Sequence, residues 1–113
     1  YMVTKIYNTN DLDNICNSFP SLCIPNVDYS ITSEYMYEKF NKLFKNKVKR
    51  IDFIVKNKNG VEVKQYFIHI KHWCRDYYLD TMRLKLLNKE CINVIHKNLE
   101  YFKCYLSISK LSK

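Results

Sequence analysis

Three side chains near the middle of the sequence are of types that bind metal ions. His69, His72 and Cys74 follow one another at short spacing, and imidazole and thiolate groups are ligands that suit Zn²⁺. On an extended strand, however, residues 69 and 72 point to opposite faces, and no fourth ligand is evident. The sequence therefore argues against a metal site here, and we expect no cofactor.

Patterns for catalysis are equally weak. The chain contains one glycine in 113 residues, which argues against a glycine-rich loop that cradles phosphates. The sequence shows no paired-acid constellation, and no Cys, His and Asp stand at a recognisable spacing. We therefore do not expect an enzyme.

The charge balance points to a different chemistry, the binding of polyanions. Lysine and arginine number 19 against 11 acidic residues, which gives a formal net charge of +8. A basic surface attracts phosphate groups at long range. Four basic residues beside apolar strand patterns are therefore candidates for phosphate contact: Arg50, Lys64, Lys71 and Lys103. The alternative is a solvated charged face, and charge alone supports nucleic-acid binding only weakly.

Hydrophobic periodicity indicates the elements that would position these residues. A turn follows the first short apolar run at Pro25, and Asn59-Gly60 is a strong hairpin-turn signal because both residue types tolerate positive φ. The expected elements are a strand at 22–24, a helix at 30–46, strands at 50–55 and 61–70, a helix at 77–88, and strands at 91–95 and 101–108. This order predicts an α+β, ferredoxin-like βαββαβ sandwich with two helices on one face of a four-stranded antiparallel sheet and an extra short strand before the last.

Alternation along residues 61–70 separates a core face from an open face. Tyr66 and Ile68 share one side, and Gln65, Phe67 and His69 share the other. Trp73 is expected to pack at the end of this strand against the second helix. The predicted core includes Phe40, Ile51, Phe53, Tyr66, Ile68 and Leu86.

Two stretches of the sequence resemble signature motifs of the RNA-recognition-motif (RRM) family. Leu22–Val27 has the shape of that family's first strand and turn, and Val63–Ile70 aligns with its third-strand signature. Phe67–Trp73 and Phe102–Tyr105 are also similar to the third and last strands of small RRM-like proteins of large DNA viruses. The resemblance covers about residues 20–108 and implies an RRM-like fold.

The resemblance also implies a base-stacking platform, from which this sequence departs. RRM domains stack bases on exposed aromatic side chains of the two central strands. Phe67 keeps one of the three usual positions, whereas Cys23 and Gln65 occupy the other two. Tyr101 and Tyr105, with Lys103, are expected to replace the lost rings in part from the edge strand. The alternative for Phe67 and Tyr105 is an ordinary exposed aromatic, or one covered by a terminal segment.

Two functions remain open at this point. The first is a binder of single-stranded nucleic acid, RNA above all, that uses Phe67, Gln65, His69 and Cys23 on the open sheet face with the surrounding basic residues. The second is an RRM-like protein–protein module that has lost base stacking and self-associates or docks to a larger complex. Fold alone does not decide between them.

The chain is expected to have three parts. Residues 1–20 form an N-terminal extension that packs on the domain, and whether it covers the sheet face stays open at this point. Residues 21–109 form the RRM-like domain, and residues 110–113 form a basic tail. The five cysteines are odd in number with no closely spaced pair, which is typical of reduced thiols in an intracellular protein, in the cytoplasm or nucleus of a host cell or in a virion. No apolar stretch is long enough to span a membrane, and the sequence starts without the apolar core of a signal peptide.

Overall fold

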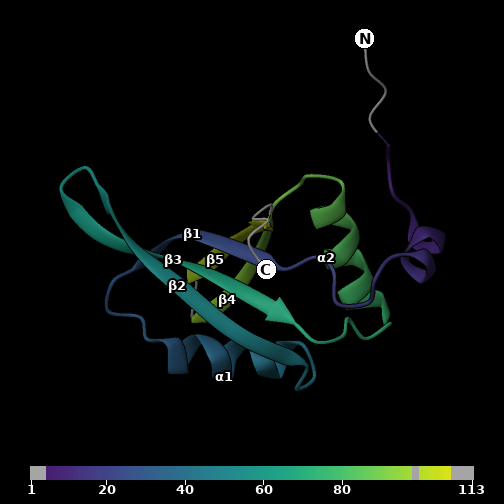
Figure 1. Cartoon of the computed structure of the whole chain (residues 1–113), viewed down its shortest axis with the longest axis horizontal. Coiled ribbons are helices and arrows are strands. Elements are labelled where there is room, and N and C mark those ends of the chain that lie inside the picture. The colour runs from purple at the N-terminus through teal and green to yellow at the C-terminus, as the bar shows by residue number, and fades with distance from the viewer. Residues whose placement is uncertain (1–4, 98–99, 108–113) are drawn as a thin grey trace, which may run out of the picture.

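The computed structural model describes residues 5–97 and 100–107, which form an open antiparallel sheet with two helices on one face (Figure 1). The predicted basic tail, residues 110–113, lies outside the described residues. The elements are a 3-10 helix η1 (Thr9–Asn14), β1 (Leu22–Asp28), α1 (Ser33–Leu43), β2 (Val48–Lys58), β3 (Val61–Ile70), α2 (Tyr77–Leu87), β4 (Ile92–Lys97) and β5 (Glu100–Leu106).

The sheet has five strands in the order β2-β3-β1-β5-β4, and neighbouring strands pair antiparallel. This confirms the predicted α+β fold, a ferredoxin-like arrangement with an extra strand. The expected position of the last strand at the sheet edge is wrong, because β4 pairs with the outer side of β5. None of the helices in the described ranges has the length and apolar character to cross a membrane.

Local signals account for where the two helices begin. The side chain of Thr32 accepts a hydrogen bond from the Tyr35 amide at the start of α1, and Asp76 accepts one from the Leu79 amide at the start of α2. Such caps satisfy backbone donors that have no partner within the helix. Each first turn also carries an acid that favours the positive end of the helix dipole.

The strands depart from the sequence prediction at Pro25 and agree with it at the hairpin. Asn59 and Gly60 both have positive φ, 52° and 84°, as a tight turn between β2 and β3 requires. The first strand does not end at Pro25 but continues to Asp28. Its register with β3 shifts between Ile24 and Val27, and a bulge of this kind accommodates a residue that cannot donate to the ladder.

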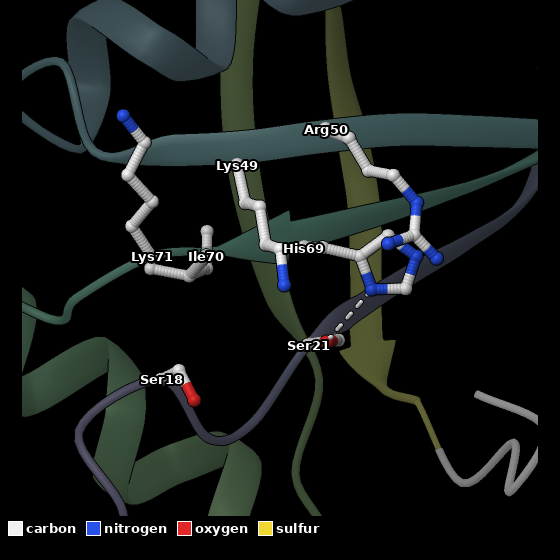
Figure 2. A pocket seen from close by; sticks show the side chains of 7 residues that line it. All are labelled: Ser18, Ser21, Lys49, Arg50, His69, Ile70 and Lys71. Atoms are coloured by element: carbon white, nitrogen blue, oxygen red, sulfur yellow. Dashed lines mark hydrogen bonds between the residues drawn. The ribbon is translucent and has the colours of Figure 1, made fainter. Parts of the chain in front are cut away.

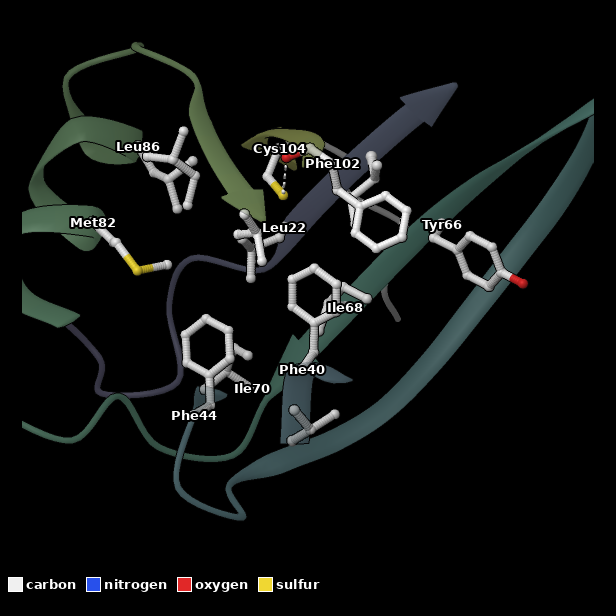
Figure 3. Packing of buried hydrophobic residues seen from close by; sticks show 14 of the residues in the cluster. Leu22, Phe40, Phe44, Tyr66, Ile68, Ile70, Met82, Leu86, Phe102 and Cys104 are labelled. Carbon is white, nitrogen blue, oxygen red and sulfur yellow. Dashed lines mark hydrogen bonds between the residues drawn. The ribbon is translucent and has the colours of Figure 1, made fainter. Parts of the chain in front are cut away.

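The core lies between the helices and one face of the sheet (Figure 3). Phe40, Tyr66, Ile68 and Leu86 are fully buried there, as predicted, and Ile51 packs against the cluster while remaining partly buried. The prediction for Phe53 is wrong, since this side chain is 41% exposed. The β2–β3 hairpin projects beyond the helices in Figure 1, and Phe53 packs on the Tyr66 ring at 5.3 Å without helical cover.

The described part of the N-terminal segment lies against α2 (Figure 1). The Asn88 side chain forms two hydrogen bonds with the backbone of Tyr7. Closer to β1, the guanidinium of Arg83 donates to the carbonyls of Cys16 and Phe19, each at 2.9 Å. These contacts hold residues 5–20 beside the helix layer, away from the centre of the open sheet face.

Trp73 connects this segment to the core. Its indole Nε1 donates to the Pro20 carbonyl at 3.0 Å, and its backbone amide donates to the Asn17 carbonyl at 2.7 Å. The ring meets Phe44 edge to face, and the Arg83 guanidinium lies over it. The predicted packing of Trp73 against the second helix is therefore confirmed, with the end of α1 as a further neighbour.

Candidate functional site

A cross-strand row runs over the sheet face opposite the helices. In the strand register, Asp52 of β2 lies opposite Phe67 of β3, Phe67 lies opposite Cys23 of β1, and Cys23 lies opposite Tyr105 of β5. Directly paired residues of an antiparallel sheet point to the same face. The helices cover the face of Tyr66 and Ile68, so this row belongs to the open face.

The row holds two aromatic rings with a small residue between them. Tyr105 is 39% exposed and Phe67 is partly buried. Two strand spacings separate the backbones under the rings by about 10 Å, so each ring offers a separate surface. Gln65 donates from Nε2 to the Cys23 sulfur at 3.1 Å, and burial raises the pKa of the Cys23 thiol. Cys23 is thus a neutral floor between the two rings.

A polar chain lies beside Phe67 at the β3 end of the face. The imidazole of His69 contacts the Ser21 hydroxyl through Nδ1 at 3.2 Å and the Asp52 carboxylate through Nε2 at 3.0 Å. Arg50 donates to the same carboxylate oxygen at 3.0 Å. The imidazole plane is therefore fixed from both sides.

The Ser21–His69–Asp52 hydrogen-bonded chain contains the residue types of a hydrolase triad, but its geometry favours a role in positioning His69 over a role in catalysis. The Asp52 side chain is 49% exposed and is shared with Arg50, whereas the carboxylate of a Ser-His-Asp triad is buried and serves its histidine. Exposure to water weakens the field that would stabilise an imidazolium during proton transfer. We interpret the chain as a device that orients His69.

The polar chain forms one wall of a basic cavity of about 580 Å³ (Figure 2). The lining consists of Ser18, Ser21, Lys49, Arg50, His69, Ile70 and Lys71. Val48 pairs with Ile70 and Arg50 pairs with His69, so Lys49 is the extra residue of a β-bulge. The bulge allows two consecutive basic residues, Lys49 and Arg50, to line the same hollow.

The structure brings together all but one of the residues predicted for the site. Lys64 lies on the helix-side face, where its ammonium donates to the Ile31 carbonyl at 3.0 Å and sits over the Phe53 and Tyr29 rings. Its strand phase matches that of Tyr66, so it cannot reach the open face without leaving these partners. The residues placed on the open face or at its rim are Cys23, Arg50, Gln65, Phe67, His69, Lys71, Lys103 and Tyr105.

Sequence reasoning missed Ser21, Lys49 and Asp52. Strand alternation with Arg50 could have placed Asp52 on the open face, but its contact with His69 depends on the β2–β3 register. Ser21 precedes the first strand and belongs to no motif. As for the His69, His72 and Cys74 set, no group of three metal-ligating side chains comes together within residues 5–97 and 100–107. His69 is instead bonded to Ser21 and Asp52.

Comparison with known proteins gives no relative for this geometry. No family model, curated protein or solved structure matches the chain. The strand order and helix placement are those of a βαββαβ-like topology consistent with an RRM-like fold. The function must therefore be argued from the open face itself.

Proposed function

We propose that the open sheet face binds single-stranded nucleic acid, with RNA as the principal ligand. The observation that carries this proposal is the cross-strand row in which Phe67 and Tyr105 flank Cys23 next to a basic cavity. Unpaired bases stack on exposed aromatic side chains, and each such stack contributes about 1–3 kcal/mol. Basic groups beside the rings attract the phosphates that accompany the bases.

The distribution of charge on this face fits a strand that crosses the sheet. Lys103 lies on the open face of β5, two residues from Tyr105, and Arg50 and Lys71 lie at the β2–β3 end. Lysine serves as a point charge toward phosphate, whereas base reading favours Arg, Asn or Gln. We therefore expect modest affinity, strong salt dependence and weak sequence preference.

Family membership belongs to the same proposal. We infer that the chain is a divergent RRM domain related to the small RRM-like proteins of large DNA viruses, on the motifs at Leu22–Val27 and Val63–Ile70. Partial retention of stacking positions, Phe67 with Cys23 and Gln65 in place of rings, supports divergence within that fold. A reducing intracellular location is in line with five free cysteines.

A second function is favoured by a specific observation, the apolar side chains that the open face leaves in water. Ile54 and Ile95 are more than half exposed, as is Tyr101. The first two flank opposite sides of the aromatic row, on β2 and β4. A protein partner or second copy that buried these side chains would make the face a docking surface.

Fluorescence anisotropy with a labelled single-stranded RNA of about eight nucleotides decides between the two functions. We expect Phe67→Ala to weaken binding by about 5- to 150-fold, the equivalent of one lost stack. Tyr77→Ala is the matched control, because Tyr77 is 87% exposed on α2 and should leave affinity unchanged. Lys103→Ala should lower affinity and reduce the salt slope by about one. Failure to bind at about 50 mM salt, where electrostatic contacts are strongest, would refute the proposal.

A further inference from the structure

The basic cavity at the end of the open face keeps an excess of positive charge among the described residues. Lys49, Arg50 and Lys71 supply three cations, and no lining residue is acidic. The Asp52 carboxylate, bonded to Arg50 and His69, offsets one of them. The remaining two positive charges match a phosphate monoester, which carries about −1.5 to −2 at pH 7, better than a backbone diester.

The lining also supplies hydrogen-bond donors from several directions. In Figure 2, Lys49 and Arg50 extend from β2 toward His69, while Ser18 and Ser21 stand on the segment that leads into β1. The ammonium, guanidinium and hydroxyl groups all donate to phosphate oxygens. Ser21 and Asp52 fix the imidazole between these walls. The lining therefore supplies positive charge and hydrogen-bond donors of the kinds that bind phosphate.

Residues 17–20 form a fixed wall at the end of the open face, next to the basic cavity. Residues 17–20 are held by the Trp73 amide and indole and by the Arg83 guanidinium, and Pro20 is buried. The cavity lies about 7 Å along β3 from Phe67, the length of two strand residues. A strand whose base stacks on Phe67 would thus meet the wall with its neighbouring phosphate in the cavity.

We propose that this cavity takes a terminal phosphate monoester of the bound strand, so that the protein prefers phosphorylated ends to hydroxyl ends. The proposal rests on the proposed function, because the phosphate is delivered by a strand that lies on the open face. It goes further in naming the end chemistry that the face selects. The shared chemistry is the monoester, and a 5′-phosphate and a 3′-phosphate are its two sources.

Competition binding with three unlabelled RNAs of one sequence tests the proposal: one with a 5′-phosphate, one with a 3′-phosphate and one with hydroxyl groups at both ends. We expect one phosphorylated form to bind about 10- to 150-fold tighter than the hydroxyl form, as one added hydrogen bond to a charged group would give. Which form gains identifies the source of the monoester and the direction of the strand.

Variants separate this site from general charge. Lys49→Ala should reduce the preference to less than about twofold while the hydroxyl form still binds, and Lys49→Arg should restore it. Lys58→Ala, at the exposed hairpin tip, removes the same charge and should leave the preference intact. Equal affinity for all three RNAs overturns the terminal-phosphate inference and leaves the proposed function standing. Absence of binding to any of them overturns the proposed function itself.

Discussion

Arg83 is a buried cation without a carboxylate partner among the described residues, and its removal should cost the fold several kilocalories per mole. The side chain is 1% exposed, donates to the carbonyls of Cys16 and Phe19, and lies over the Trp73 ring. A hydrogen bond to a charged group contributes about 1.5–3 kcal/mol. For Arg83→Ala, which also leaves a cavity, we expect a loss of about 3–5 kcal/mol.

Two further variants divide this loss into its parts. Arg83→Met keeps most of the volume and removes the donors, so it should cost at least about 2 kcal/mol. Arg75→Met is the matched control: Arg75 pairs with Asp13 and Asp80 at the surface, and exposed pairs contribute about 0–1 kcal/mol.

Urea denaturation monitored by the fluorescence of Trp73, the only tryptophan, measures all three variants. The far-ultraviolet circular dichroism transition provides a second probe that does not depend on the residues around the indole. If Arg83→Met is as stable as the parent protein, the two carbonyl contacts contribute nothing and the arginine acts as apolar filling. Residues 16–20 would then be held by Trp73 alone.

Three other expectations follow from the core and the site. Ile68→Ala should lower the free energy of unfolding by about 2–5 kcal/mol through the cavity it leaves, and a value near zero in urea denaturation would contradict the observed packing. Burial lowers the pKa of His96. The stability linked to this shift is therefore complete above the unfolded-state pKa near 6.5 and is lost as pH falls through the lower folded-state pKa, by at most about 1.4 kcal/mol per pH unit. Denaturation at stepped pH should show this slope in the parent protein and a smaller slope in His96→Phe. In RNA binding, the free-energy losses of Phe67→Ala and Tyr105→Ala should add within about 0.5 kcal/mol, since the rings lie on strands about 10 Å apart, and strong coupling in the double variant would indicate that they grip one base together.

Much of the fold could be predicted because its signals are local. Strand alternation, helical spacing and the Asn59-Gly60 turn gave the element order, and the single core followed from Phe40, Tyr66, Ile68 and Leu86. Phe53 was misplaced because its phase is that of a core residue, whereas its burial depends on how far the helix layer reaches. No local sequence pattern indicates how far along the hairpin the helices cover the sheet.

The site was less predictable because its members meet through register. The prediction for Lys64 rests on charge and neglects its strand phase, which groups it with Tyr66. The contacts of His69 with Ser21 and Asp52 need the pairing of three strands. The role of Lys49 needs a one-residue bulge that nothing in the sequence announces. Side chains on one strand could be grouped by alternation, but their neighbours across strands could not.

The pairing of β1 with β5 determines when the cross-strand row is completed during synthesis of the protein. Cys23 and Tyr105 stand opposite each other although they come from strands near opposite ends of the described chain. Such a contact closes a long loop and forms late compared with a local hairpin. A nascent chain that has completed β3 already carries Phe67, yet its aromatic row lacks the second ring until β5 has been made and paired. If the open face binds a strand as proposed, contact with both rings requires completed folding. A chain interrupted before residue 100 would have the β2–β3 hairpin and Phe67 but would lack Tyr105.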